Sequence, residues 1–143
     1  MKNLRHSALM VALLTGLMLV QPALPANAGD QDPLFINLTT NDDHRLTMAL
    51  TFSSGQMQRG HPVTLFLNDK AVLAASTANG DTFAAQQEKL MGMIEAGATV
   101  LVCPGCMKHY EVTEADLLPG MILGNPERTG QAVFAEGTQT LTW

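Results

Sequence analysis

Five short runs rich in apolar and β-branched residues alternate along the chain with longer segments of helical periodicity. This alternation constrains the fold more than any other feature of the sequence. The runs are residues 34–38, 63–67, 99–102, 121–123 and 138–143. Each reads as a short strand, and the last reads as an edge strand. Strands that alternate with helices predict a parallel sheet covered on both faces.

Helix signals occupy the segments between these runs. Asn41 or Asp42 can cap a helix that ends at Gly60, because apolar residues recur between them at helical spacing. Residues 81–97 predict a second long helix, and residues 126–135 a third that opens on an Asn-Pro pair. Shorter elements are expected as a loop with one turn of helix over 72–79 and a helical turn opened by a capping box over 113–116.

Together these elements predict an α/β fold. We expect a compact three-layer domain with a roughly five-stranded, mainly parallel sheet of the flavodoxin-like type. No repeat, low-complexity tract or internal linker divides residues 29–143, and their number suits one domain.

Residues 1–28 have the three parts of a secretory signal peptide. A basic start with Lys2 and Arg5 precedes a 13-residue apolar run over 8–20, and a small-x-small ending places the cleavage after Ala28. Thirteen helical residues reach only about 20 Å, short of the roughly 30 Å hydrocarbon core of a bilayer. We therefore expect an exported, periplasmic protein with no membrane attachment once the peptide is cleaved.

Charge excludes one class of partner. Removal of Lys2 and Arg5 leaves six basic against 13 acidic residues over the 115 residues of the mature chain, a formal charge of −7. A protein that binds nucleic acid needs clustered Lys and Arg to neutralise phosphates. We expect no nucleic-acid partner.

The two cysteines of the chain, Cys103 and Cys106, follow the predicted strand at 99–102, which we expect to be the most deeply buried of the five. Chemistry in open α/β sheets collects at the carboxyl ends of the strands, which is where Cys103 falls. If a helical turn starts at Pro104, its free N–H groups point at the Cys103 sulfur and favour the nucleophilic thiolate. Lys108 and His109 add possible positive charge nearby, and His109 is the better acid–base candidate.

Three interpretations of this pair follow from the residues alone. The cysteines can form a structural pair, either as two thiols or as a local disulfide. They can cycle by thiol–disulfide exchange in an oxidising compartment. With Met107 and His109 they can also bind a soft metal such as Cu(I), or Zn²⁺. No other cofactor is expected, because the loop after the first strand is acidic and not a glycine-rich phosphate loop.

Four segments, taken in order, resemble the DsrE/DsrF-like sulfur-relay family, in particular its TusD-like members. Residues 34–40 with the acidic pair that follows resemble its first strand and helix start, and residues 59–63 resemble its Gly-His-x-Val entry into the second strand. Residues 97–103 resemble its third strand, which ends in the sulfur-carrying cysteine, and residues 113–120 resemble its D-L-x-x-G segment. The resemblance covers essentially the whole mature chain.

This resemblance implies that Cys103 accepts sulfane sulfur as a persulfide. Cys106 lies where the well-known relay members carry a small residue other than cysteine, and it is expected to act as a supporting or resolving thiol. The resemblance also implies a homo-oligomer, a trimer or a hexamer, and a protein that donates or accepts sulfur. Export is a second departure, because the known relays work in the cytoplasm. We therefore expect a periplasmic sulfur-handling protein, with redox chemistry, metal binding or protein binding at the same cysteines as alternatives.

Overall fold

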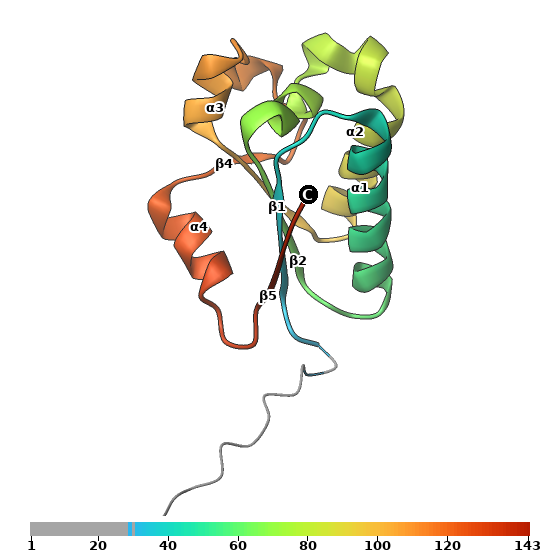
Figure 1. Cartoon of the computed structure of the whole chain (residues 1–143), viewed down its shortest axis with the longest axis vertical. Helices are drawn as coiled ribbons and strands as arrows, with labels where there is room; N and C mark the ends of the chain where they lie inside the picture. The colour runs from blue at the N-terminus through green and yellow to red at the C-terminus, as the bar shows by residue number, and fades with distance from the viewer. Residues whose placement is uncertain (1–28, 30) are drawn as a thin grey trace, which may run out of the picture.

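A computed structural model describes Gly29 and residues 31–143, arranged as a sheet with helices packed on it (Figure 1). The predicted signal peptide lies outside the described residues. Within them, no helix is both long enough and apolar enough to cross a membrane. The strands are β1 (Leu34–Leu38), β2 (Val63–Leu67), β3 (Thr99–Val102), β4 (Ile122–Leu123) and β5 (Gln139–Thr142). The α-helices are α1 (Asp43–Gln58), α2 (Gly80–Glu95), α3 (Pro104–His109) and α4 (Pro126–Val133).

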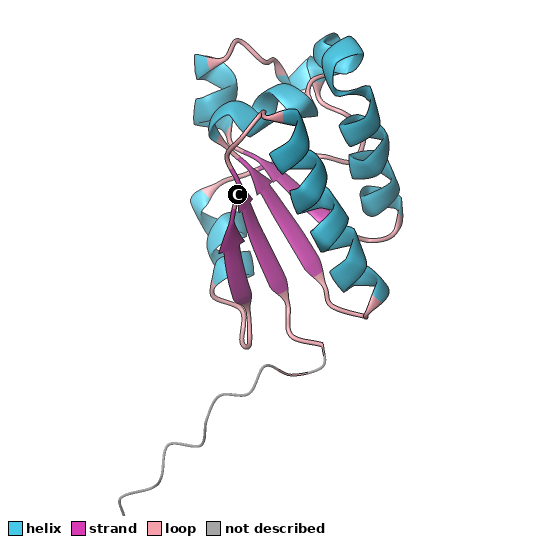
Figure 2. Ribbon diagram, turned by 45° about the vertical axis from the view of Figure 1, so that its right-hand side comes forward, coloured by secondary structure: helices cyan, strands magenta, loops and turns pink. Residues whose placement is uncertain are grey.

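The five strands form one sheet in the order β4-β3-β2-β1-β5, and every neighbouring pair is parallel (Figure 2). This confirms the predicted α/β class with its five-stranded parallel sheet. The strand order differs from the 2-1-3-4-5 order of flavodoxin. Here the chain steps from β1 through β4 in one direction and then returns across the sheet to place β5 beside β1.

That return explains the three layers. Parallel crossovers are right-handed, so a connection that runs back across the sheet places its helix on the opposite face. Figure 1 shows α1 and α2 on one side of the sheet and α4 on the other. The strand register puts Ile36, Leu65 and Val100 side by side, and all three are fully buried in the core that α1 and α2 cover.

Helix α1 begins and ends at the residues that the sequence predicts. Asp42 is the N-cap residue, and its Oδ1 accepts a hydrogen bond of 2.9 Å from the backbone N–H of Arg45. Leu46 and Leu50 are fully buried on the face that meets the sheet. Gly60 has a φ of +94°, a conformation that glycine adopts without cost, and it turns the chain from α1 toward β2.

The stretch between β2 and α2 contains more helix than the sequence predicts. Two 3₁₀-helices, η1 (Asp69–Ala75) and η2 (Thr77–Asn79), replace the expected loop with one turn. Four apolar residues of η1 are buried: Ala71, Val72, Ala74 and Ala75. At seven residues the segment is shorter than the window over which helical periodicity is recognised, so the pattern does not identify it. A third 3₁₀-helix, η3 (Glu114–Asp116), opens at the predicted capping box.

Candidate functional site

Cys103 lies at the carboxyl edge of the sheet, immediately after β3. Its backbone N–H donates to the carbonyl of Leu67 at 2.9 Å, which ties it to the end of β2. On the other side, the N–H of Gly124 donates to the carbonyl of Val102 at 2.8 Å. Cys103 therefore lies at the carboxyl end of β3, as the sequence predicts, and its backbone is bonded to the end of β2.

The helical turn expected at Pro104 is present. Pro104 is the first residue of α3, and Cys103 is the N-cap residue. The backbone N–H of Cys106 donates to the Cys103 sulfur at 3.3 Å. A cysteine side chain here takes the position that a serine or aspartate oxygen takes in an ordinary cap.

The two sulfur atoms lie close together. Both cysteines are free and half-buried, and the Sγ of Cys106 donates to the Sγ of Cys103 over 2.7 Å. The separation exceeds the roughly 2.05 Å of a disulfide bond. Two donors of Cys106, one from its backbone and one from its side chain, thus converge on the Cys103 sulfur.

The surroundings of Cys106 affect the ionisation of its thiol. Burial raises the pKa of the Cys106 thiol, and its hydrogen bond to Cys103 raises it further. The backbone N–H of Asp69 lowers this pKa, while the negative charges of Cys103 and Asp69 raise it. The net direction is upward, which suits a thiol that donates a hydrogen bond.

Asp69 is a site residue that no sequence pattern indicates. It follows β2, takes a left-handed backbone with φ of +45°, and opens η1. Its carboxylate accepts a hydrogen bond of 2.5 Å from the hydroxyl of Tyr110, which raises the pKa of Tyr110. The available signal was its position, because residues that follow adjacent parallel strands meet at one edge of the sheet.

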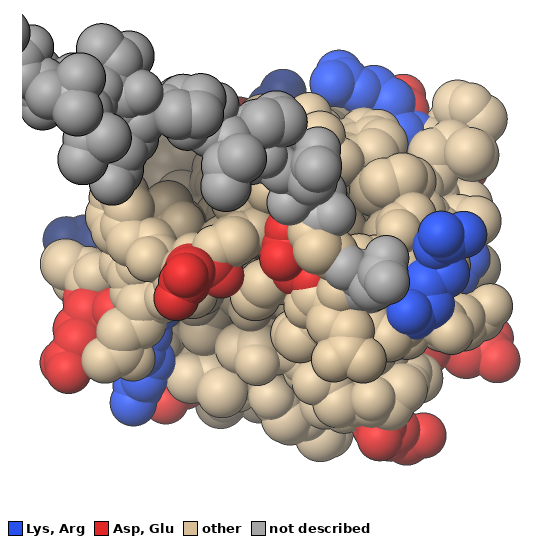
Figure 3. Space-filling view, turned by 90° about the horizontal axis from the view of Figure 1, so that it is seen from below, with Lys and Arg blue, Asp and Glu red and all other residues tan. Residues whose placement is uncertain are grey.

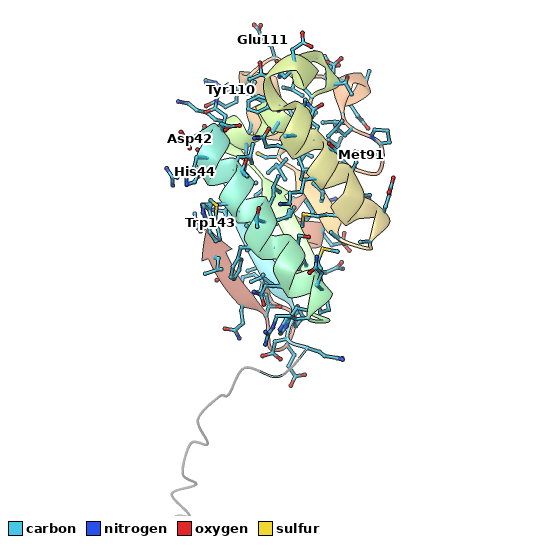
Figure 4. The ribbon with its side chains drawn as sticks, turned by 90° about the vertical axis from the view of Figure 1, so that its right-hand side faces the viewer. Asp42, His44, Met91, Tyr110, Glu111 and Trp143 are labelled. Carbon is cyan, nitrogen blue, oxygen red and sulfur yellow. The ribbon has the colours of Figure 1, made fainter. Side chains whose placement is uncertain are left out.

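His109 is exposed at the end of α3. Its ring lies edge-to-face against Tyr110, with 4.7 Å between the ring centroids and an interplanar angle of 86°. No hydrogen bond within the described part of the chain joins His109 to either sulfur. Its acid–base role stays a prediction. Figure 4 places Tyr110 at the same end of the molecule as His44, which is exposed in the first turn of α1.

The four residues of the metal interpretation are not gathered around one point. Met107 is only 5% exposed and belongs to the hydrophobic core, whereas His109 faces solvent. Among residues 29 and 31–143, no group of three or more His, Cys, Asp or Glu side chains could hold a metal ion. Cys103 and Cys106 are the pair that the fold brings together.

Two hollows lie away from the cysteines. A groove of about 710 Å³ runs between α1 and α2 and is lined by Met57, His61 and Gly97 among others. A smaller one of about 260 Å³ lies beside β5. His61 has a structural role, because its Nδ1 lies 2.9 Å from the carbonyl oxygen of Asp32. In the view of Figure 3, basic side chains are scattered among acidic ones and form no continuous patch.

These features define a small α/β protein with a dithiol at the carboxyl end of a central strand. The sequence model of the DsrE/DsrF-like family matches residues 34–140, which include both cysteines. The chain belongs to the DsrE/DsrF-like family. No curated protein matches the sequence.

Solved structures support the fold. The protein of unknown function MTH1491 from Methanobacterium thermoautotrophicum has a TM-score of 0.65 at 10% identity, covering 79% of this chain and 100% of its own. The ychN protein from E. coli has a TM-score of 0.58 at 17% identity, covering 79% and 99%. The protein BT1422 from Bacteroides thetaiotaomicron has a TM-score of 0.60 at 19% identity, covering 78% and 95%. At these identities the likeness establishes the fold alone.

Proposed function

We propose that this chain is a sulfur-handling protein in which Cys103 accepts sulfane sulfur as a persulfide. One observation carries the proposal: two donors of Cys106 converge on the Cys103 sulfur, at 2.7 Å from the thiol and 3.3 Å from the backbone N–H. Donors aimed at a sulfur atom stabilise negative charge that forms on it. Membership of the DsrE/DsrF-like family supports the same assignment.

Uptake is a sulfur transfer to a thiolate. The Cys103 thiolate attacks a sulfur atom of a donor such as inorganic polysulfide. A sulfur–sulfur bond forms to Cys103, one bond of the polysulfide breaks, and the shortened polysulfide leaves with the electron pair. Attack by a thiolate on a bonded sulfur is the general route of such exchange.

Discharge uses Cys106 as the resolving thiol. Its sulfur attacks the Cys103 sulfur, the bond from Cys103 to the sulfane sulfur breaks, and sulfide leaves with the electron pair and with the proton of Cys106. The product is a Cys103–Cys106 disulfide, which a two-electron dithiol reductant reopens. The short sulfur–sulfur separation supports this step, because little movement of α3 closes the bond.

A thiol–disulfide redox protein is the second candidate, favoured by the same separation. In that case the pair cycles between dithiol and disulfide without carrying sulfane sulfur. The Pro-Gly dipeptide between the cysteines and their place after the third strand separate the chain from redox proteins whose pair opens a helix after the first strand.

The test is an intact-mass measurement on the reduced mature protein after incubation with inorganic polysulfide. We expect Cys106→Ser to gain the mass of one sulfur atom and Cys103→Ser to gain none. Wild type should gain it transiently and then lose two hydrogens as the disulfide closes. Disulfide formation in wild type with no sulfur gain in Cys106→Ser would favour the redox candidate. If all three proteins stay unchanged while wild type retains Cu(I) or Zn²⁺ through desalting, the metal interpretation replaces both.

Export and association complete the proposal. We propose that residues 1–28 direct the chain to the periplasm with cleavage after Ala28, which N-terminal sequencing of the fractionated protein tests directly. We also propose a homo-oligomer that exchanges sulfur with a partner protein. The exposed edge strand β5 and the 86% exposed side chain of Phe134 support association. Sedimentation of the mature protein measures the oligomeric state.

A further inference from the structure

Asp69 lies at the start of η1, which packs against α3. Its backbone and its charge both affect the pKa of the Cys106 thiol. Its carboxylate accepts the hydroxyl of Tyr110 at 2.5 Å, at the residue that caps the end of the helix. One residue of η1 therefore bonds to the C-cap residue of the short helix that carries Cys106.

The conformation of Asp69 is unusual for a residue with a side chain. Its φ of +45° lies in the left-handed region, where aspartate and asparagine are the most tolerated residues after glycine. Such a conformation persists only where the surroundings hold it, and it is frequent at functional sites. Asp69 is exposed, so burial in the core does not explain why the chain takes this conformation.

The short helix has few other anchors. Met107 is its one buried side chain, and the rest of α3 is exposed or half-buried. The helix packs against η1, which Asp69 opens. The bond from Tyr110 to Asp69 is a direct side-chain link between α3 and η1.

We propose that Asp69 and Tyr110 form a clamp that holds α3 against η1, keeps the Cys106 sulfur beside Cys103, and so determines which thiol reacts first. Both are positioning residues, since neither touches the sulfane sulfur. The inference deepens the proposed function and rests on it for its biological meaning. The clamp itself concerns the reactivity of two thiols, which can be measured without any sulfur transfer.

The charged and titratable groups around Cys106 are few. Cys103 lies beside it and Asp69 faces it from η1, and both affect its ionisation. On α3 itself, Lys108 and His109 are exposed, and Tyr110 bonds to Asp69. Removal of the Asp69 charge should make the Cys106 thiolate easier to form.

The experiment compares the alkylation of each cysteine by iodoacetamide in reduced mature protein, resolved by peptide mass spectrometry across a pH series. Tyr110→Phe removes the donor of the clamp. Asp69→Gly removes the carboxylate, keeps the N–H, and accommodates the positive φ. Asp69→Asn removes the charge but keeps an oxygen that can accept from Tyr110. Glu111→Gln is the control, because Glu111 is an exposed acid next to Tyr110.

We expect Tyr110→Phe and Asp69→Gly to raise the share of first alkylation at Cys106 by about two- to tenfold, the factor that one hydrogen bond of ordinary strength carries. Asp69→Asn should retain the wild-type selectivity more closely, yet shift the alkylation midpoint of Cys106 to lower pH. Glu111→Gln should change neither quantity. A purely structural contact would lower thermal stability in Tyr110→Phe and Asp69→Gly without changing the share of first alkylation at Cys106.

Wild-type selectivity in both Tyr110→Phe and Asp69→Gly would overturn the clamp, as would an equal midpoint shift in Glu111→Gln. The clamp and the proposed function fail separately. If wild type takes up no sulfane sulfur while the variants change selectivity, the function is wrong and the clamp stands. If wild type forms a persulfide and the variants keep its selectivity, the function stands and the clamp is wrong.

Discussion

Cys106 donates to Cys103 twice, through its thiol at 2.7 Å and through its backbone N–H at 3.3 Å, and this makes the two cysteines unequal. Cys103 is the acceptor at the end of β3, and Cys106 is the donor inside α3. A dithiol whose members differ in this way has a defined attacking sulfur and a defined resolving sulfur.

The first prediction concerns the order of alkylation in wild type. Near neutral pH, Cys103 should react with iodoacetamide before Cys106, because burial and the bond to Cys103 raise the pKa of the Cys106 thiol. The rate at Cys106 should rise steeply only at alkaline pH. Time-resolved peptide mass spectrometry measures both rates, and faster reaction at Cys106 near neutral pH would contradict the assignment.

The second prediction concerns Tyr110, the single tyrosine of the chain, whose ionisation can be followed by ultraviolet absorbance. Its hydrogen bond to Asp69 raises the pKa of Tyr110 above 10.0, so the phenolate should form at a higher pH than in a free peptide. Asp69→Gly should lower the midpoint, because it removes both the bond and the charge. An unchanged midpoint would show that the contact is absent in solution.

The raised pKa values of Cys106 and Tyr110 affect the stability of the fold in the same direction. A group whose folded pKa exceeds its unfolded pKa binds its proton more tightly in the folded state. The stabilisation from Cys106 and Tyr110 is complete below the unfolded pKa values and is lost as the pH rises through the folded ones. Urea unfolding should therefore show falling stability above about pH 9, and Tyr110→Phe should weaken that dependence.

A pair of glycine substitutions tests the fold. Gly120→Ala should destabilise the protein by more than about 1 kcal/mol for two reasons. Gly120 has a φ of +84°, and an added Cβ would lie 2.7 Å from the Cγ2 of Ile94. Gly92→Ala, inside α2 with no atom within 4 Å of the new Cβ, should stabilise by about 0.5–1 kcal/mol. Chemical denaturation measures both, and equal effects would contradict the packing described for Gly120.

A further prediction concerns sulfide. Wild type treated with polysulfide, desalted, and left without reductant should release one sulfide for each disulfide that closes. Cys106→Ala should hold its persulfide and release far less, because the resolving thiol is missing. Sulfide is measured colorimetrically beside the free-thiol count, and equal release from both proteins would remove Cys106 from the discharge step.

Much of the fold could be predicted from the sequence because its signals are local. Alternating strand and helix patterns predict a parallel sheet, and the cap at Asp42 and the turn at Gly60 fix the ends of α1. The strand order could not be predicted in the same way. The order depends on which strand the last strand pairs with. The pattern of residues 138–143 indicates an edge strand but does not predict which strand lies beside it.

The candidate site was predictable to the same extent. Cys103 and Cys106 stand out because their spacing and their place after β3 are visible in the sequence. Asp69 does not stand out, because its role depends on the pairing of β2 with β3 and on a positive φ that no local sequence pattern predicts. Conversely, His109 is near the cysteines in sequence, yet the fold turns its ring toward Tyr110.

The most direct test of the central claim is site-resolved fragmentation of the peptide that contains both cysteines, after brief exposure of reduced wild-type protein to limiting polysulfide and rapid alkylation. We expect the additional sulfur atom on Cys103, with Cys106 alkylated as a free thiol. An additional sulfur found on Cys106 with Cys103 free, or on neither cysteine, would contradict the role proposed for Cys103.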